Sequence, residues 1–273
     1  MTSAPGESAG PENPLDLTGK VAIVTGGTKG LGKIIAQTFL AAGANVMVCA
    51  RNAPDEPVTA GEAAAEFQAA DVREPDQIDA VVAATVEAFG RVDILVNNAG
   101  GAPLAESATV SPRFNAAIIA LNLTAPITFS QAFFRQVSQQ DSTDAPPVII
   151  NISSVSGTRP NPHGVAYGAA KAGLNNVTQT LAHEWGPAVR VLGVTVGLIR
   201  TAEGSDYYGD DDGAAAVGDV LPLKRMGDPQ EVADVVTFLV SPLARWMTGT
   251  NVEVHGGGEG AAYVAASTAD LPS

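Results

Sequence analysis

The feature that most restricts the fold is a short apolar run, a glycine-rich turn and a helical periodicity in direct succession. Val21 to Val24 form an apolar run of strand length, and the turn from Thr25 to Gly32 follows. From Leu31 to Ala42 apolar residues recur at helical spacing until Gly43, which is well placed to end a helix. Such a unit brings free backbone N–H groups and the positive end of a helix dipole together, which suits a phosphate-bearing ligand. Without a ligand, the same segment is simply a glycine-rich turn between a strand and a helix.

The rest of the chain repeats this alternation of strand and helix. Further strand-like runs are residues 45–50, 67–70, 92–96, 148–152, 189–196 and 252–254, and helical segments are expected from about Leu31, Pro75, Ser111, Val165 and Pro229. Residues 52–65 predict a loop with at most a short helix, and residues 200–227 lack clear periodicity. Strands that are apolar throughout and alternate with helices are typical of a parallel sheet covered on both faces. The predicted fold class is therefore α/β, a doubly wound, Rossmann-type parallel sheet.

Length and composition indicate one soluble domain. A chain of 273 residues suits a single large α/β domain. We expect a disordered segment at residues 1–14, the domain at 15–257 with a lid at about 200–227, and a tail at 258–273. The first residues have neither the basic nor the apolar region of a signal peptide, and no uninterrupted apolar run approaches the roughly 20 residues of a membrane span. A cytoplasmic location is predicted.

Charge and residue counts exclude several classes of partner. The formal net charge of −14 disfavours nucleic acid and anionic membranes, because both attract basic surfaces. Because Cys49 is the single cysteine, an intramolecular disulfide is impossible. It lies in an apolar run, so its side chain is expected to be buried. The three histidines show no metal-ligand spacing, and no metal is predicted.

Several motifs resemble those of the short-chain dehydrogenase/reductase family, in its compact single-domain branch. They are Thr25-Gly-x-x-x-Gly30-x-Gly32, Asn97-Asn98-Ala99-Gly100, the set Asn122, Ser154, Tyr167 and Lys171, and Gly197 with Thr201. Val196 departs from the pattern, since the family usually has proline there. The likeness covers roughly residues 17–257. It implies an NAD(P)-dependent oxidoreductase with seven strands in the order 3-2-1-4-5-6-7, assembled as a homotetramer.

The resemblance also implies where the cofactor binds. The implied residues are Gly26, Thr28, Lys29, Gly30, Leu31, Gly32, Arg51, Asp71, Val72, Asn98, Ala99, Gly100, Tyr167, Lys171, Gly197, Ile199 and Thr201. A carboxylate at the end of the second strand would bind a ribose 2′-hydroxyl, whereas a cation would accept a 2′-phosphate. The strand ends in Arg51 with no acid, and Lys29 offers a second positive charge, so NADP(H) is predicted and NAD(H) is the alternative cofactor. Asp71 is expected either to contact adenine or to cap a helix.

The catalytic assignment depends on Tyr167 and Lys171. They are four residues apart in a predicted helix and therefore share a face. A tyrosine with a pKa near 10 is a poor base at neutral pH, and a neighbouring ammonium favours its phenolate. The resemblance implies that Ser154 and Tyr167 hydrogen-bond the substrate oxygen while hydride is transferred. It further implies that Tyr167 is the general acid/base, Lys171 holds the ribose and Asn122 keeps a relay water in place. By itself, such a Tyr–Lys pair is more often an ordinary surface pair on a helix.

Two other functions and the substrate stay open at this stage. One alternative is a non-catalytic NADP(H)-binding regulator. The presence of Ser154, Tyr167 and Lys171 argues against it, because a regulator need not retain them. A sugar-nucleotide epimerase or dehydratase of the extended branch is the other, but little sequence remains after Val254 for its larger substrate domain. The predicted lid is acidic, which argues mildly against a substrate with several phosphates. A small carbonyl or secondary alcohol is expected, whether 3-oxoacyl thioester, steroid, sugar or another ketone.

Overall fold

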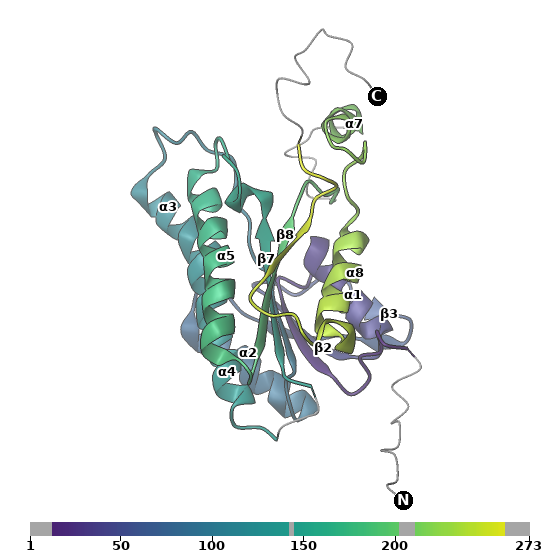
Figure 1. Cartoon of the computed structure of the whole chain (residues 1–273). Coiled ribbons are helices and arrows are strands. Elements are labelled where there is room, and N and C mark those ends of the chain that lie inside the picture. Colours follow the sequence, from purple (N-terminus) through teal and green to yellow (C-terminus); the bar gives the residue numbers. More distant parts are fainter. Residues whose placement is uncertain (1–12, 142–144, 202–210, 260–273) are drawn as a thin grey trace, which may run out of the picture.

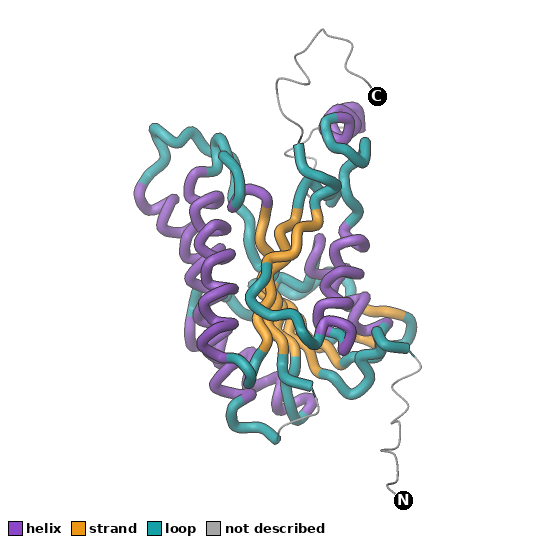
Figure 2. Tube along the Cα trace, in the orientation of Figure 1, coloured by secondary structure: helices purple, strands orange, loops and turns teal. Residues whose placement is uncertain are grey.

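A parallel sheet of seven strands lies between two layers of helices in the computed structural model, which describes residues 13–141, 145–201 and 211–259 (Figures 1 and 2). Its strands are β1 (Val21–Thr25), β2 (Asn45–Ala50), β5 (Glu66–Ala69), β6 (Ile94–Asn97), β7 (Val148–Ser154), β8 (Arg190–Val196) and β9 (Asn251–Val254). The spatial order is β5-β2-β1-β6-β7-β8-β9, and every neighbouring pair is parallel. Numbered among themselves, these strands have the order 3-2-1-4-5-6-7. The predicted fold class is therefore confirmed.

Helices cover both faces of this sheet. On one face α1 (Gly30–Ala41) packs beside α8 (Pro229–Val240). On the other lie α2 (Pro75–Phe89), α4 (Ala125–Val137) and α5 (Val165–Trp185), and α3 (Pro112–Ile119) packs against α5 (Figure 1). The described residues also form the π-helical turn η1 (Ala120–Thr124), the 3-10 turns η2 (Val155–Gly157) and η4 (Pro242–Ala244), the helix α7 (Asp211–Asp219), and the short strands β3 (Thr59–Ala60) and β4 (Ala63–Ala64).

Alternation along the strands supplies one hydrophobic core on each face. In β1, Ala22 and Val24 join the core under α1 and α8, whereas Ile23 joins the core under α2 and α4. Phe39 fills the first core, and Phe133 the second; both are 0% exposed. Because successive side chains of a strand point to opposite faces, a strand buried on both sides must be apolar throughout. This is the pattern that the sequence shows.

Two segments differ from the expectation based on sequence. Residues 52–65 contain no helix but a small antiparallel hairpin, β3 paired with β4, whose turn includes Gly61 at a φ of +59°. Prolines earlier in this segment disfavour a helix, and a glycine supplies the positive φ that the turn requires. Residues 211–219 form α7, although no helix was predicted between residues 200 and 227. Three consecutive alanines give that segment helical propensity.

The helix predicted from about Ser111 towards Gln139 forms, with an interruption. Ser111 caps its first turn by accepting a hydrogen bond from the backbone N–H of Phe114 at 3.1 Å. A π-helical turn, η1 (Ala120–Thr124), then separates α3 from α4. Among the described residues, Pro112–Val137 is the one helical stretch long and apolar enough to cross a membrane. This is weak evidence for a span, because helices in the cores of soluble proteins meet the same criteria and Phe133 is buried against the sheet.

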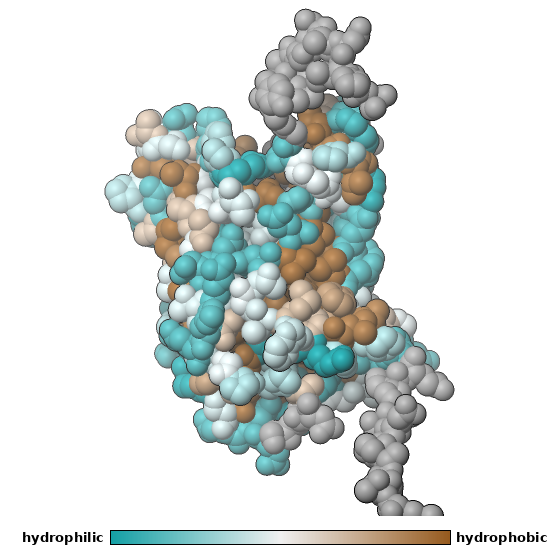
Figure 3. All heavy atoms as spheres, in the orientation of Figure 1, coloured by the Kyte–Doolittle hydropathy of each residue, from teal (hydrophilic) through white to brown (hydrophobic). Residues whose placement is uncertain are grey.

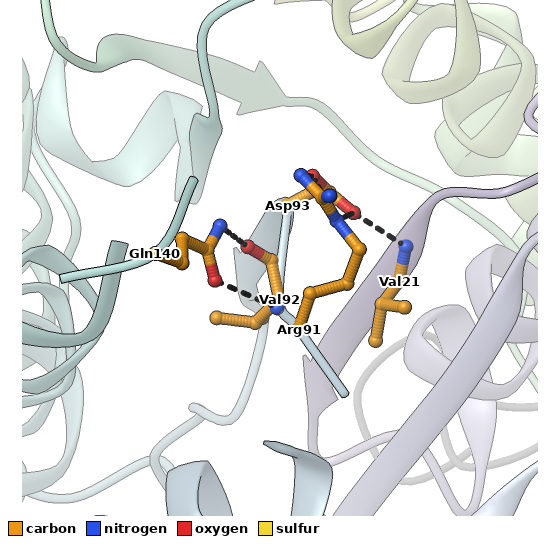
Figure 4. Close-up of polar contacts among 5 residues, drawn as sticks. All are labelled: Val21, Arg91, Val92, Asp93 and Gln140. Carbon is orange, nitrogen blue, oxygen red and sulfur yellow. Dashed lines mark hydrogen bonds and ion pairs between the residues drawn. The ribbon is translucent and has the colours of Figure 1, made fainter. Parts of the chain in front are cut away.

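A cluster of polar contacts ties β1 to β6 where both strands begin (Figure 4). The carboxylate of Asp93 is 3% exposed, accepts a hydrogen bond from the backbone N–H of Val21 at 3.0 Å and forms an ion pair with Arg91 at 2.7 Å. The side-chain amide of Gln140 hydrogen-bonds both the N–H and the C=O of Val92. These contacts fix the amino ends of the strands, so their opposite ends are held in register.

Some sequence-based expectations fall outside the described residues. They concern the segment before residue 13, residues 202–210 of the predicted lid, with its acidic and tyrosine residues, and the tail after residue 259.

Candidate active and cofactor site

A pocket of about 540 Å³ opens at the carboxyl ends of the central strands, beside the first turn of α1. Of the residues predicted to bind the cofactor, those that line it are Gly26, Thr28, Lys29, Gly30, Leu31, Gly32, Arg51, Asp71, Val72, Asn98, Ala99, Gly100 and Thr201. Tyr167, Lys171, Gly197 and Ile199 do not line it. In open α/β sheets ligands bind in a crevice at the carboxyl ends of the strands, which is where this pocket lies.

The glycine-rich turn lies directly against the segment after β6. A Cβ on Gly32 would be 2.3 Å from Nδ2 of Asn98 and 2.4 Å from the carbonyl oxygen of Gly26, so no side chain fits there. Gly26 has a φ of +63°, which favours glycine. None of the described side chains caps the first turn of α1. Its backbone N–H groups are therefore available to an anion at the pocket wall.

The two asparagines at the end of β6 link neighbouring strands. Asn97 is 3% exposed, and its Nδ2 donates to Oδ1 of Asn151 at 2.9 Å, which joins β6 to β7. Nδ2 of Asn98 donates to the carbonyl of Thr25 at 2.9 Å. The hydroxyl of Thr25 accepts from the backbone N–H groups of Asn98 and Ala99, both at 2.9 Å. These contacts hold the floor of the pocket rigidly to the end of β1.

One end of the pocket carries three cations. Lys29 and Arg51 are exposed, and neither side chain makes a hydrogen bond or ion pair within the described ranges. Arg73 also lines the pocket and binds the carboxylate of Asp71 through two side-chain hydrogen bonds. Arg73 and, more weakly, the positive charge of Arg51 hold the pKa of Asp71 at about 2. Asp71 therefore stays ionised and paired.

Tyr167 and Lys171 lie near each other on α5. Nζ of Lys171 is 5.6 Å from the centroid of the Tyr167 ring and donates a hydrogen bond to the carbonyl oxygen of Ile152 at 2.8 Å. Lys171 is 4% exposed, and this burial lowers the pKa of its ammonium to about 8. At pH 7 the ammonium is still mostly protonated, so a positive charge lies beside the tyrosine ring.

Asn122 occupies the π-helical turn, where its side chain makes three hydrogen bonds. Its Nδ2 donates to the carbonyl oxygens of Ile118 and Gly101, and its Oδ1 accepts from the N–H of Gly101 at 2.8 Å. A Cβ on Gly100 would be 2.7 Å from Oδ1 of Asn122 and 3.4 Å from Nζ of Lys171. Asn122 and Lys171 thus meet at Gly100, where the pocket adjoins α5.

Ser154 is the last residue of β7, and its Oγ accepts a hydrogen bond from the backbone N–H of Ser156 at 3.1 Å. The preceding serine, Ser153, is 2% exposed and donates to the backbone carbonyl of Lys171. Ser153 is therefore turned towards α5 and is buried, whereas Ser154 is only partly buried. Of the two serines, Ser154 is therefore the more accessible.

The last residue of β8 and the residues that follow it lie in different parts of the structure. Val196 pairs in register with Ser154, and it is 6% exposed. A Cβ on Gly197 would lie 2.5 Å from the Cβ of His255, so Gly197 packs against the end of β9. Ile199 forms an isolated bridge with Gly227, whereas Thr201 reaches the cofactor pocket.

The sequence reasoning missed part of the pocket lining. The missed residues are Cys49, Ala50, Ala70, Arg73, Gly101 and Leu121. For Arg73 a signal existed, since it is a third cation two residues after Asp71. Most of the others contribute small or apolar surface that no motif marks. Cys49 is buried, as expected, and this burial raises the pKa of its thiol to about 12.

The chain is similar in sequence and fold to several known proteins. A family model described as enoyl-(acyl carrier protein) reductase matches residues 26–259. A 3beta-hydroxysteroid dehydrogenase 1 from Eggerthella lenta is 36% identical over 250 residues, which cover 89% of this chain and 94% of that protein. A 3-oxoacyl-(acyl-carrier-protein) reductase FabG from Vibrio cholerae is 36% identical over 251 residues, covering 89% and 98%. The structure of the RhlG/NADP active-site complex from Pseudomonas aeruginosa superposes with a TM-score of 0.80 at 28% identity, covering 90% of this chain and 98% of that one.

Proposed function

Because the chain belongs to the short-chain dehydrogenase/reductase family and is an NAD(P)-dependent oxidoreductase, we propose that it uses NADP(H) and that Tyr167 is its general acid/base. The proposed reaction interconverts a small carbonyl compound and the corresponding secondary alcohol. The observation that carries the assignment of Tyr167 is the buried ammonium of Lys171, 5.6 Å from the centroid of its ring.

The residues of the pocket fit a dinucleotide. Gly26 and Gly32 let the turn pack tightly against Asn98 and Ala99 at the pocket wall, and the uncapped first turn of α1 offers N–H donors to a pyrophosphate. When bound, the cofactor supplies or accepts the hydride. The far end of the pocket supports the choice of NADP(H), because Lys29 and Arg51 carry unpaired positive charges where a 2′-phosphate would need them.

Proton transfer is assigned to the catalytic side chains of α5 and β7. The charge of Lys171 favours the phenolate of Tyr167 over the neutral phenol, which makes the tyrosine a more effective proton donor and acceptor near neutral pH. Ser154, at the end of β7, would hydrogen-bond the substrate oxygen and stabilise charge that develops there. Asn122, fixed to Gly101 and Ile118 by its three hydrogen bonds, would hold a relay water near Lys171.

The proposal is tested by following oxidation of NADPH and NADH with a panel of 3-oxoacyl thioesters, ketosteroids and sugar-derived ketones. We expect turnover of at least one carbonyl, faster with NADPH, and a loss of more than about a hundredfold in Tyr167→Phe with unchanged cofactor affinity. Near-normal turnover by Tyr167→Phe would refute the acid/base assignment. Tight cofactor binding without turnover in either direction would favour the regulatory alternative.

We also propose that the protein is a cytoplasmic homotetramer. Within the described residues β9 is the outermost strand on its side of the sheet, and Val252 and Val254 on it are only half-buried. Figure 3 shows hydrophobic residues gathered on the face that includes β9 and α8, which supports contact with another copy. Light scattering coupled to size exclusion measures the mass directly; a monomer of 27.7 kDa would refute the assembly.

A further inference from the structure

The pairing of Arg73 with Asp71 affects how the pocket would recognise a 2′-phosphate. Asp71 follows β5, and Arg51 follows β2, its neighbour in the sheet, with Ala50 opposite Ala69 in register. This register brings Arg51 and Asp71 to the same edge of the sheet, and both line the pocket. A carboxylate in that position is the natural ion-pair partner of Arg51.

The carboxylate of Asp71 forms its ion pair with Arg73 instead. The backbone N–H and the Nε of Arg73 both donate to Oδ1 of Asp71, at 3.0 and 2.9 Å, and its Nη2 donates to Oδ2. Such a two-pronged pair between guanidinium and carboxylate is stronger than a single contact. An ionised carboxylate offers about four acceptor positions, so one remains for another donor such as an adenine amino group.

The charge balance of the pocket gives this pairing a consequence. The protein has a formal net charge of −14, so a doubly charged phosphate approaches against an unfavourable overall field. Among the residues that line the pocket, Lys29, Arg51 and Arg73 are cations and Asp71 is the carboxylate. Without Arg73, one carboxylate would face two cations and would compete with the phosphate for Arg51.

We propose that Arg73 is a positioning residue for the cofactor: by holding Asp71, it leaves Arg51 free to bind the 2′-phosphate of NADP(H). This inference rests on the proposed cofactor preference and extends it to a residue that need not touch the phosphate itself. It predicts that Arg73 matters for the phosphorylated cofactor, and only while Asp71 is a carboxylate.

The test is a double-mutant cycle read out by binding. Dissociation constants for NADPH, NADH, adenosine 2′,5′-bisphosphate and adenosine 5′-monophosphate are measured for the wild type, Arg73→Met, Asp71→Asn and the double variant. We expect Arg73→Met to weaken NADPH and the bisphosphate about tenfold, and NADH and the monophosphate less than about twofold. In the Asp71→Asn background, the same change should weaken NADPH less than about threefold.

Matched controls separate this effect from damage to the fold. Arg135→Met breaks another arginine–aspartate pair, with Asp79, on an exposed surface away from the pocket, and should leave all four affinities unchanged. Thermal melts check that each variant is folded; if Arg73→Met is not, Arg73→Lys, which keeps the charge but cannot form the two-pronged pair, replaces it in the cycle.

The outcomes distinguish this inference from the function on which it rests. Equal weakening of NADPH and NADH by loss of Arg73, or equal losses with and without the Asp71 carboxylate, would overturn the role of Arg73. If the wild type binds NADPH no more tightly than NADH, the proposed cofactor preference itself fails. If Arg51→Ala removes the preference and Arg73→Met does not, the preference stands and only the role of Arg73 is refuted.

Discussion

Replacing Lys171 by methionine should make the cofactor-free protein more stable while it abolishes turnover. The ammonium is buried, and burial lowers its pKa from 10.5 to about 8. Each unit of difference in pKa between the folded and the unfolded protein corresponds to about 1.4 kcal/mol. Keeping the buried ammonium charged at pH 7 therefore destabilises the fold by about 3 kcal/mol. Loss of its hydrogen bond to the carbonyl of Ile152 should offset about 1 kcal/mol of the gain. The net increase expected for Lys171→Met at pH 7 is about 2 kcal/mol.

The sign of the pH dependence follows from proton counts. Between pH 8 and 10.5 the unfolded chain holds the Lys171 proton and the folded protein has released it. Stability of the wild type therefore gains from this group as pH rises through that window. Lys171→Met lacks this contribution. The difference in unfolding free energy between Lys171→Met and the wild type should therefore shrink above pH 8 and vanish near pH 10.

Urea unfolding of both proteins at several pH values between 7 and 9.5 measures the difference, because all other groups titrate in both. Lys33→Met, which removes a half-buried lysine of α1, should change stability by less than about 0.5 kcal/mol at every pH. The reasoning is refuted if Lys171→Met is no more stable at pH 7 and the difference does not change with pH.

Three further substitutions test other contacts. Asp93→Ala should lower the free energy of unfolding in urea melts by about 2 kcal/mol, because it leaves the buried N–H of Val21 unpaired. The control is Asp79→Ala, which breaks an exposed ion pair and should change the free energy of unfolding by less than about 0.5 kcal/mol. Arg190→Met should cost about 2 kcal/mol in the same assay, since the buried guanidinium donates to three backbone carbonyls; equal stability would contradict a role for those bonds. Gly100→Ala should reduce turnover more than about tenfold in steady-state assays, because its Cβ would displace Asn122; unchanged turnover would show that Asn122 is not needed where it lies.

Periodicity predicted the architecture because each element carries its own signal. The bounds of β2 and the first residue of α5 agree with the sequence-based expectation, because β2 is a continuous apolar run and α5, with 21 residues, is long enough to show a helical pattern. The hairpin of β3 and β4 was missed, because two-residue strands of small residues have no detectable alternation. α7 was missed because it is only nine residues long and contains two glycines, which have low helix propensity.

The parts of the candidate site in which a motif fixes the backbone could be predicted from the sequence. The parts in which contacts between distant segments determine the environment of a side chain could not. The glycine turn and the end of β6 meet in one pocket, as their motifs implied. The environment of Lys171 was not readable from spacing, because its burial depends on elements far apart in the sequence. Arg73 was overlooked because its importance depends on what Asp71 and Arg51 do in space, which only the sheet register reveals.

The π-helical turn Ala120–Thr124 introduces a phase shift within one continuous helix. An α-helix advances by about 100° per residue, and a π turn accommodates one more residue than an α turn. Asn122 can therefore point at Gly101 while Phe129 and Phe133, further along, still point into the core. Removing one residue from the turn would restore regular α geometry and rotate one half of the helix about its axis relative to the other. Either the amide or the two phenylalanines would then face the wrong way, so the two requirements cannot be met by an uninterrupted α-helix of this sequence.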